Sequence, residues 1–491
     1  MVPICECKGV FQLNEISLES GCAPAKWNCD ADEEGWSALV LFGSPHTCPP
    51  AKGKSMLDSE QVATIESTAR RYEELLEDSF CPNFGIFPSA KSDSNFFNQV
   101  YARDSAHAIC SYFAEAHPEA AECSLATLFK FQREDGAIPL RVEREFQLVE
   151  LTPGLRRFSK QIFNLVQRKL KGKEEHPVFE GGDCGVSGAE DTIPLVLIAA
   201  GEFFAVSPKG RIFGQNQFGR LQHAAAFFQT KTDPSDGLAV ITRMNPDWAD
   251  SLNRKGKLGG INVWWARSLK AMELMARSIG RDGDAKRFRE NFRRTKQSIL
   301  EKLYAPEGYF RAEECDNRID TVASIFGALY LLSPVEASKV VKTLDSCVRK
   351  ATGLQNFAPP YPAGNIALSH RAWSLLARLK QVATRKEESG MDDYHNRFVW
   401  PWVTCQSIQV KIKIANEHTE ESIRAEFKYE ALEDLARVSN ILQRAGGPYE
   451  ILDPDEERPA RIVAYTPQSN FLGTMAAYQG VYRRAKRLGW L

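Results

Sequence analysis

Two carboxylates flank a tryptophan in residues 244–270, which read MNPDWADSLNRKGKLGGINVWWARSLK. Asp247 and Asp250 stand on either side of Trp248, and a basic glycine-rich loop then leads into an apolar helix with two further tryptophans. Carboxylates beside indoles suit a site that stacks on sugar rings and protonates a glycosidic oxygen from a partly desolvated acid. An aspartate before a helix is also an ordinary N-cap. The stretch alone therefore leaves both interpretations open.

The composition and charge exclude several classes of partner. The chain has 491 residues, 43% of them hydrophobic, and its 62 basic and 63 acidic residues give a formal net charge of -1. This balance creates no whole-chain field that would attract nucleic acid or an anionic membrane, so we expect a neutral partner. The length permits two or three domains or one large ring of helices. A homo-oligomer is compatible with these totals, which do not decide the point.

The N-terminal segment lacks the pattern of an export signal. Glu6, Lys8, Glu15 and Glu19 interrupt a region in which a signal would need a continuous apolar stretch. No later apolar run reaches the length of a membrane span. We therefore expect a soluble, cytoplasmic protein.

Twelve cysteines occur, and five of them cluster near the N-terminus. Their spacing lacks the paired C-x2-C of a structural zinc site, and free thiols are the usual state in a large intracellular chain. We therefore expect no metal ion and no other cofactor, with a zinc or disulfide staple as the alternative. Cys110 and Cys405 lie in apolar helical surroundings and are expected in the core. The N-terminal cysteines are Cys5, Cys7, Cys22, Cys29 and Cys48.

Residues 1–55 and 56–491 differ in their patterns. The first range mixes Gly, Pro and short apolar runs, which predicts a short irregular or β appendage. At Asp58, a capping Asp-Ser-Glu opens a long helix with an apolar repeat. Strand-like stretches are few and short. Further helices are predicted at about 103–116, 118–132, 155–171, 190–206, 212–230, 261–279, 282–303, 320–332, 334–348, 365–386, 399–412, 418–444 and 468–488.

These predicted helices are of two kinds that alternate along the chain. One kind is rich in Arg, Lys and Glu between its apolar positions, as expected of helices with one solvated face. The other is apolar or small nearly all round, as in DTVASIFGALYLL, and is expected to be buried on every side. Six such alternations predict an all-α (α/α)6 toroid over residues 56–491, with 155–171 and 365–386 as insertions. The outer helices begin near Asp58, Pro118, Ile212, Asp282, Pro334 and Thr419, and the inner ones near Arg103, Glu190, Ile261, Asp320, Val399 and Gln468.

Acids, amides and aromatic residues gather where the inner helices begin. In a toroid the inner helices share one direction, so the segments that precede them meet at one mouth. We therefore expect a polar, aromatic-lined pocket there. Its candidate sugar-binding residues are Tyr101, Arg103, Asp104, Asp191, Asp247, Trp248, His395, Asn396, Trp400 and Trp402.

Five motifs in order resemble the amylo-α-1,6-glucosidase domain of glycogen-debranching enzymes, and more distantly neutral invertases and processing α-glucosidases. The similarity runs from about residue 95 to the end, and the sharpest motif is the family's H-N-G-x-x-W-P-W. The matching segments here are Tyr101-Ala-Arg103-Asp104-Ser105, Asp247-Trp248-Ala-Asp250-Ser251 with Ile261-Asn262-Val-Trp264-Trp265, Tyr361-Pro-Ala-Gly364-Asn365, His395-Asn396-Arg-Phe-Val-Trp400-Pro401-Trp402, and Tyr449-Glu450-Ile-Leu-Asp453.

The resemblance implies a six-hairpin, inverting glycoside hydrolase that acts on an α-glucosidic bond. Asp250 matches the family's general acid and Glu450 its general base. An inverting pair stands about 6.5–9.5 Å apart so that a water fits between the carboxyls. We expect Trp248 to help desolvate Asp250, and the acidic run DPDEE to raise the pKa of Glu450 by like charge.

The departures from the family lie around the pocket, so they concern the glycone, the linkage and the aglycone. Arg397 replaces the family's Gly, Asp247 replaces its Thr, and the final A-Q-A-W element is absent. The β-sandwich domain that usually precedes the toroid in these relatives cannot fit into the first 55 residues.

Three rival functions compete with hydrolysis. A binding protein on the same toroid would need no paired carboxylates. A sugar epimerase or polysaccharide lyase would use proton-abstracting bases, for which His395 and Tyr101 are available. A structural role for His395 also stays open. A zinc-dependent toroid is disfavoured because no Asp, Cys and His stand at ligand spacing.

Overall fold

The computed structural model describes residues 57–92, 98–144, 175–179, 190–242, 247–366, 389–390, 392–462 and 465–491. Contacts divide the chain into two units, Met1–Ser44 and Pro45–Leu491, and all described residues belong to the second. The predicted appendage, its five cysteines and the insertion at 155–171 lie outside the described residues. So does the insertion at 365–386, apart from its first two residues.

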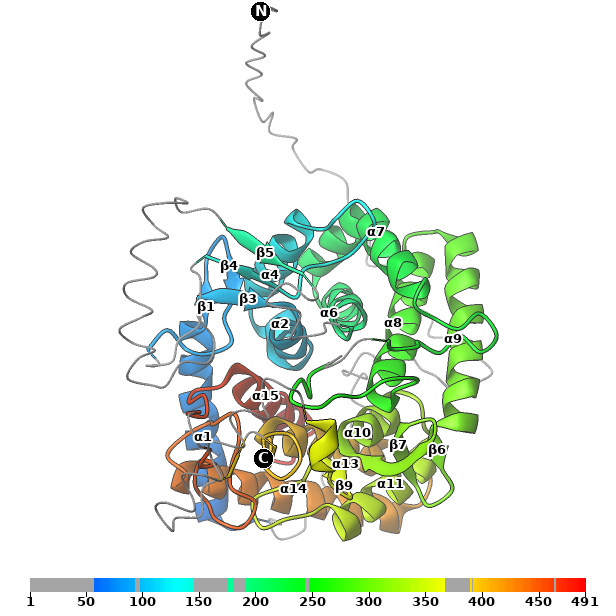
Figure 1. The fold of residues 1–491 in the computed structure, drawn as a ribbon. Coiled ribbons are helices and arrows are strands. Elements are labelled where there is room, and N and C mark those ends of the chain that lie inside the picture. The colour runs from blue at the N-terminus through cyan, green and yellow to red at the C-terminus, as the bar shows by residue number, and fades with distance from the viewer. Residues whose placement is uncertain are drawn as a thin grey trace, which may run out of the picture. The chain divides into compact units, whose positions relative to one another are not determined.

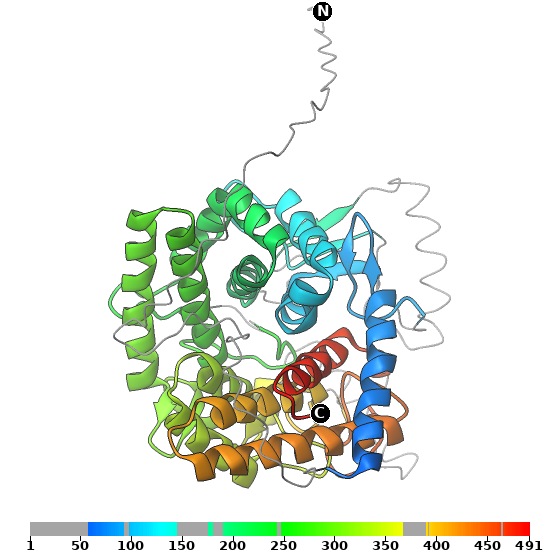
Figure 2. The same ribbon diagram turned by 180° about the vertical axis from the view of Figure 1, so that it is seen from behind.

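The described helices of this unit form two concentric rings (Figures 1 and 2). Around the inner ring α2 contacts α6, α6 contacts α8, α8 contacts α10, α10 contacts α13, α13 contacts α15, and α15 returns to α2. Each inner helix follows an outer helix, which confirms the (α/α)6 toroid. The outer helices are α1 (Ser59–Asp78), α4 (Pro118–Lys130), α7 (Pro208–Gln229), α9 (Asp282–Lys302), α11 (Pro334–Cys347) and α14 (Glu421–Arg444). The inner ones are α2 (Ala102–Ala108), extended by the π-helix η1 (Ile109–Phe113) and α3 (Ala114–Ala116), then α6 (Thr192–Val206), α8 (Gly259–Ser278), α10 (Thr321–Tyr330), α13 (Pro401–Glu417) and α15 (Leu472–Arg487).

Burial explains the two kinds of helix. In α6 every residue from Thr192 to Phe204 is buried, and its single acid, Glu202, forms an ion pair with Arg267 of α8. In α9, by contrast, residues such as Phe288 and Phe292 are buried while most of the charged residues between them reach solvent. An apolar face on one side therefore places a helix in the outer ring, and apolar residues all round place it inside.

The first and last described helices pack together and close the ring. The rings of Tyr72 in α1 and Tyr478 in α15 lie 5.2 Å apart, and the Tyr478 hydroxyl donates a hydrogen bond to the carbonyl of Ile65 at 3.1 Å. On its other side α15 approaches η1 so closely that a Cβ on Gly480 would lie 2.9 Å from the Ser111 carbonyl oxygen. No helix among the described residues is both long and apolar enough to cross a bilayer.

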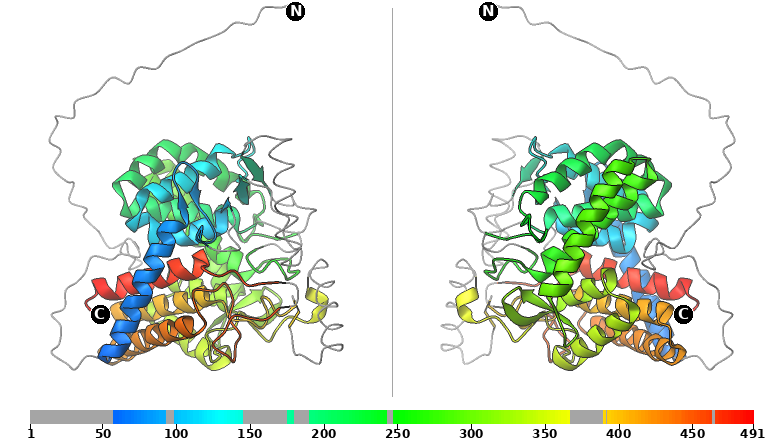
Figure 3. Two further views of the ribbon diagram at one scale, coloured as in Figure 1. Left: turned by 90° about the vertical axis from the view of Figure 1, so that its left-hand side faces the viewer. Right: turned by 90° about the vertical axis from the view of Figure 1, so that its right-hand side faces the viewer.

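Short antiparallel strands gather at one end of the helical rings (Figure 3). Through β3, which pairs Tyr101 with Arg141, and β8, which pairs Asp320 with Phe357, they lead directly into α2 and α10. A 3-10 turn, η2 (Ala363–Asn365), follows the last strand. The strands are β1 (Phe80–Cys81), β2 (Gly85–Ile86), β3 (Gln99–Tyr101), β4 (Arg141–Glu143), β5 (His176–Val178), β6 (Tyr304–Ala305), β7 (Tyr309–Glu313), β8 (Asp316–Asp320) and β9 (Phe357–Ala358).

Candidate active site

The starts of the first two inner helices are joined by a bidentate ion pair. Arg103, in the first turn of α2, donates from Nε to Oδ2 of Asp191 at 2.6 Å and from Nη2 to Oδ1 at 3.0 Å. Asp191 is fully buried at the N-terminus of α6. A fork geometry of this kind fixes the guanidinium in one orientation. Asp191 therefore positions Arg103 at the mouth.

Asp250 lies beside this ion pair. Burial raises the pKa of the Asp250 carboxyl to about 6, the positive charge of Arg103 opposes the rise, and the negative charges of Asp247 and Asp191 reinforce it. Within the described residues, no side chain of another residue hydrogen-bonds to this carboxyl. Asp250 is thus a carboxyl that can hold its proton near neutral pH and that no other side chain of the described residues engages in a hydrogen bond.

Glu450 is buried and held by three hydrogen-bond donors. The Tyr394 hydroxyl donates to its Oε1 at 2.5 Å, the Tyr465 hydroxyl donates to Oε2, and the backbone N–H of Gln468 donates to Oε2 at 3.2 Å. Burial raises the pKa of Glu450, the three hydrogen bonds counteract the rise, and the charge of Asp250 adds to it. Donors aimed at a carboxylate favour its ionised form.

The sequence predicts that the acidic run after Glu450 raises the pKa of that residue, but the structure gives a different cause. The like charge that acts most strongly on Glu450 is Asp250. The nearest acid of the run, Asp453, instead faces Arg458, whose Nη2 lies 3.3 Å from its Oδ2. This ion pair offsets the negative charge of Asp453. Sequence reasoning also missed Tyr394 and Tyr465, although Tyr394 directly precedes the His395 motif.

Tyr101 and Asp104 complete the polar part of the mouth. Burial raises the pKa of Asp104 to about 6, Arg103 opposes the rise, and Glu450 reinforces it. The ring centroid of Tyr101 lies 5.4 Å from the guanidinium carbon of Arg141 on the neighbouring strand. Tyr101, Arg103 and Asp104 are each only partly exposed. The first, second, third and sixth hairpins thus contribute charged groups that interact within one site.

An aromatic cluster forms the other wall. The Trp248 ring stands nearly perpendicular to the rings of His395, Trp400 and Trp402, with centroids 5.2, 5.6 and 5.5 Å away. His395 stacks on Trp400 with centroids 5.0 Å apart and planes 8° apart. The indole N–H of Trp400 donates to the Tyr394 carbonyl at 3.1 Å. All four rings are buried, so they hold one another in fixed orientations.

His395 and Asn396 support neighbouring loops. The Oγ of Ser251 lies 2.7 Å from Nδ1 of His395, so the histidine is hydrogen-bonded to the residue that follows Asp250. The side-chain amide of Asn396 accepts from the Tyr361 backbone N–H at 2.9 Å and donates to the Tyr361 carbonyl at 3.1 Å. Both residues therefore have structural contacts, and their predicted contacts to a sugar stay predictions.

Asp247 is buried next to Arg254, which sequence reasoning did not select. Arg254 Nη2 contacts both carboxylate oxygens of Asp247, and Nη1 lies 3.4 Å from Oδ2 of Asp320. The side chains of these three residues are at most 1% exposed. The only sequence signal for Arg254 was its place in the basic loop after Asp250.

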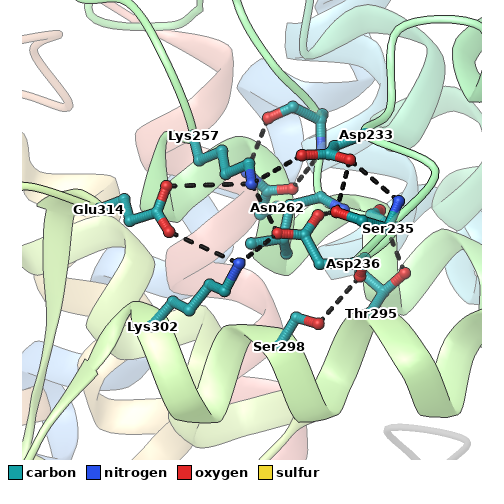
Figure 4. Close-up of polar contacts among 12 residues, drawn as sticks. Asp233, Ser235, Asp236, Lys257, Asn262, Thr295, Ser298, Lys302 and Glu314 are labelled. Atoms are coloured by element: carbon teal, nitrogen blue, oxygen red, sulfur yellow. Dashed lines mark hydrogen bonds and ion pairs between the residues drawn. The ribbon is translucent and has the colours of Figure 1, made fainter.

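A second ion cluster anchors the end of this loop (Figure 4). Lys257 Nζ lies 2.6 Å from Oδ2 of Asp236 and 3.1 Å from Oδ2 of Asp233. Lys302 of α9 contacts the same Asp236 oxygen, and Glu314 lies within 3.9 Å of Lys257. These contacts tie the start of α8 to α9 and to the hairpin of β7 and β8. Among the described residues, no group of three or more His, Cys, Asp or Glu is arranged to hold a metal ion.

Comparisons with known proteins identify solved structures with the same fold. No family model matches the chain, and no curated protein matches it. A rhamnosidase from Klebsiella oxytoca with rhamnose bound has a TM-score of 0.53 and 13% identity, covering 90% of this chain, which spans 66% of the rhamnosidase. A variant of an enzyme described as a glycosidase has a TM-score of 0.56 and 11% identity, covering 89% of this chain and 100% of that one. A GH63 mannosylglycerate hydrolase from Thermus thermophilus in complex with glucose has a TM-score of 0.52 and 15% identity, covering 85% and 99%. At these identities the likeness shows the fold: the chain has the helical toroid found in these glycosidases.

Proposed function

We propose that the chain is an inverting glycoside hydrolase that cleaves an α-glucosidic bond in a small saccharide, glycoside or oligosaccharide. Asp250 is the proposed general acid and Glu450 the proposed general base. The observation that carries the proposal is the difference between two carboxyls at one mouth, the partly exposed Asp250 and the buried Glu450. Asp250 has a pKa of about 6, with no side-chain hydrogen bond from another described residue, whereas Glu450 is held by two hydroxyls and a backbone N–H.

Each environment suits one half of the reaction. A general acid must carry a proton at the working pH and release it to the leaving oxygen, and burial prepares Asp250 for that step. A general base must be ionised, and the donors around Glu450 favour its charged form. As Asp250 transfers its proton, the bond from the anomeric carbon to the leaving oxygen breaks. Water adds from the opposite face and its proton passes to Glu450, which inverts the anomeric centre.

The remaining residues at the mouth are proposed to bind the sugar. Arg103, held by Asp191, and Asp104 offer a donor and an acceptor for hydroxyl groups. Tyr101, Trp248 and Trp402 offer apolar surface to ring faces. His395, Asn396 and Trp400 hold the aromatic wall and the loop of Asp250 in place. Such polar groups are left unpaired when a hydroxyl is missing, so we expect strong discrimination against deoxy sugars.

The fold and the motifs support this proposal more than its rivals. The compared structures with this toroid are described as glycosidases or hydrolases, and the sequence resemblance to the debranching family implies the acid role for Asp250 and the base role for Glu450. The lyase or epimerase alternative would use His395 or Tyr101 as a base. This histidine is fully buried and its Nδ1 lies 2.7 Å from Ser251 Oγ. Burial raises the pKa of the Tyr101 hydroxyl, which disfavours the phenolate that would abstract a proton. No observation on the described residues favours that alternative.

The proposal is tested by product analysis. Purified protein is incubated with sucrose, trehalose, isomaltose and glucosylglycerate, and the first anomer released is identified by proton NMR. Inversion predicts that an α-glucoside first yields β-glucose. Trehalose and isomaltose also release glucose as the leaving group, so the anomer is decided on sucrose and glucosylglycerate, whose leaving groups are not glucose. First release of α-glucose from these two substrates would contradict the inverting mechanism, and an eliminated, unsaturated product would support a lyase instead.

A further inference from the structure

A fully buried arginine lies between two buried aspartates beside the proposed acid. The Arg254 side chain is 0% exposed, and the side chains of Asp247 and Asp320 are each 1% exposed. The Arg254 guanidinium carbon also lies 4.9 Å from the centroid of the Phe357 ring. Burying an ion is costly unless it is paired, and removing one partner leaves an uncompensated charge. Each of the three ions therefore depends on the other two.

This ion cluster joins the loop of the acid to the neighbouring inner helix. Asp320 is the N-cap of α10 and accepts a hydrogen bond from the Ala323 N–H at 2.8 Å. Arg254 belongs to the loop that precedes α8 and contacts Asp320 from it. The position of the loop is consequently set by the N-terminus of α10.

Asp247 connects this ion cluster to the turn that carries Asp250. Its Oδ1 accepts a hydrogen bond from the Ala249 N–H at 3.1 Å, which fixes the turn that carries Trp248 and leads to Asp250. On the far side, the contact from Ser251 to His395 holds the residue after Asp250. The acid is therefore clamped from both sides.

Asp247 also acts on Asp250 through its charge. After burial, which is the main cause, its carboxylate and that of Asp191 raise the pKa of Asp250, and Arg103 lowers it. Among the described residues, the groups that interact electrostatically with Asp250 include Tyr101 and Arg103 from the first hairpin, Asp191 from the second, Asp247 from its own loop, Tyr394 from the fifth and Glu450 from the sixth.

We propose that Arg254 and Asp320 hold Asp247 as a positioning residue, which acts on the reaction through Asp250 and does not touch the sugar. The proposal rests on the proposed function, because it takes Asp250 as the general acid. Both oxygens of Asp247 face Arg254, and its side chain is 1% exposed. A sugar hydroxyl could reach it only by breaking a buried ion pair.

The decisive variant is Asp247→Asn, which keeps the acceptor oxygen for the Ala249 N–H and removes the charge. The proposal predicts that the pKa of Asp250 falls, so the alkaline limb of the profile of kcat/KM against pH moves to lower pH. KM measured below that limb stays within about twofold of the parent value, because no sugar contact is lost. A tenfold or larger rise in KM with an unmoved limb would overturn the proposal, since this is the behaviour of a sugar ligand.

Two further measurements separate this proposal from the proposed function and from simple destabilisation. The pKa of Asp250 is followed directly by NMR of protein labelled with 13C-aspartate, with the Asp250→Asn spectrum as assignment, so the test survives if no glycoside in the panel is cleaved. Glu202→Gln is the matched control, because it also removes a buried carboxylate paired with an arginine. It is expected to lower Tm without moving the resonance of Asp250.

If Asp247→Asn does not fold, Asp320→Asn takes its place. Asparagine retains the N-cap acceptor and removes a negative charge from Arg254, which then neutralises Asp247 more completely. The pKa of Asp250 should again fall. An unchanged Asp250 titration in this variant would refute the proposal.

Discussion

The two acids assigned to catalysis differ in the groups that surround their carboxyl oxygens. Burial raises the pKa of both Asp250 and Glu450, so burial alone would make both of them weak acids. The hydroxyls of Tyr394 and Tyr465 separate them, because a phenol donates to a carboxylate and stabilises its charge. Paired carboxyls with opposed environments are the arrangement from which acid and base roles are assigned.

Replacement of Asp250 by Asn should remove the proton donor while preserving shape. We expect kcat on a natural glycoside to fall by about 10²–10⁴-fold, the range of general acid catalysis. A glycosyl fluoride needs little protonation of its leaving group, so its turnover should fall much less. Steady-state kinetics on both substrates measure the difference.

Glu450→Gln provides the comparison, because loss of the base should slow both substrates alike. Equal losses on the glycoside and the fluoride in Asp250→Asn would contradict the assignment of Asp250 as the acid.

Tyr394→Phe should alter the base and leave the acid in place. The Tyr394 hydroxyl donates to Glu450 and thereby lowers its pKa, so its removal should raise that pKa. The base must be ionised, and the acidic limb of the profile of kcat/KM against pH should therefore move to higher pH. Tyr361→Phe is the matched control, because its hydroxyl faces Glu313 at 3.3 Å instead. An acidic limb that moves in the control, or stays fixed in Tyr394→Phe, would argue against Glu450 as the base.

At the scale of elements, the sequence predicts what depends on local pattern. Inner and outer helices could be told apart from the sequence, because the spacing of apolar residues indicates whether a helix is buried on one face or on all faces. The start of α15 was placed at Gln468, four residues early. The Gln468 N–H instead donates to Glu450, and Asn470 adopts a positive φ of 47°, so the helix begins at Leu472. The hydrogen bond to Glu450 and the backbone conformation of Asn470 thus delay the start of the helix that the local pattern predicts.

The parts of the site that the sequence could not predict are contacts between distant elements. Arg254 meets Asp320 across 66 positions, and Tyr394 meets Glu450 across 56. No local sequence pattern around these residues predicts which distant residue each of them contacts. Asp250 and Glu450 were found because each stands in a motif with its own pattern of neighbours.

The anchor of the acid loop on α9 makes a prediction for Lys257. Lys257→Met should leave Asp236 and Asp233 with one fewer cation. The Lys257 side chain is 12% exposed and that of Asp236 is 8% exposed, so we expect a loss of about 1–3 kcal/mol in the free energy of unfolding. Urea denaturation measures it, and turnover should fall as the loop before α8 loosens.

The pair of Lys130 and Glu175, whose lysine is exposed, is the control for this prediction. The Lys130 side chain is 62% exposed, and Lys130→Met should cost at most about 1 kcal/mol. Equal losses in the two variants would show that the Lys257 cluster is an ordinary surface feature.

At the scale of the whole toroid, acidic side chains outnumber basic ones at the described part of the mouth. The inner helices all begin there, and their starts bring Asp104, Asp191, Asp250 and Glu450 to one site. Among the described residues, Arg103 forms an ion pair with Asp191 and acts on Asp104 and Asp250 through its charge. A fold driven only by stability would not bury these acids in one place. Proteins accept such local cost where it produces function.

The unfolding of the molecule should therefore depend on pH in a direction opposite to that of ordinary acid denaturation. Burial raises the pKa values of Asp104, Asp250 and Asp320 from 3.8 to about 6. A raised pKa means that the folded protein binds the proton more tightly, so the associated stability is fully present below about pH 4 and is lost as pH rises through about 6. Between pH 5 and pH 7.5, Tm of the parent protein should fall.

Asp250→Asn removes one of these charges, so it should raise Tm at pH 7.5 and flatten its decline with pH, although it lowers kcat on natural glycosides. One pKa unit corresponds to about 1.4 kcal/mol, so the gain should be about 1–3 kcal/mol. Asp135→Asn is the control, since this exposed aspartate has a lowered pKa from its hydrogen bond with Arg133 and stays ionised throughout the window. Differential scanning calorimetry at several pH values measures all three proteins. If Asp250→Asn and the parent protein lose Tm with the same slope, Asp250 does not carry a raised pKa, and its assignment as the acid loses its physical basis.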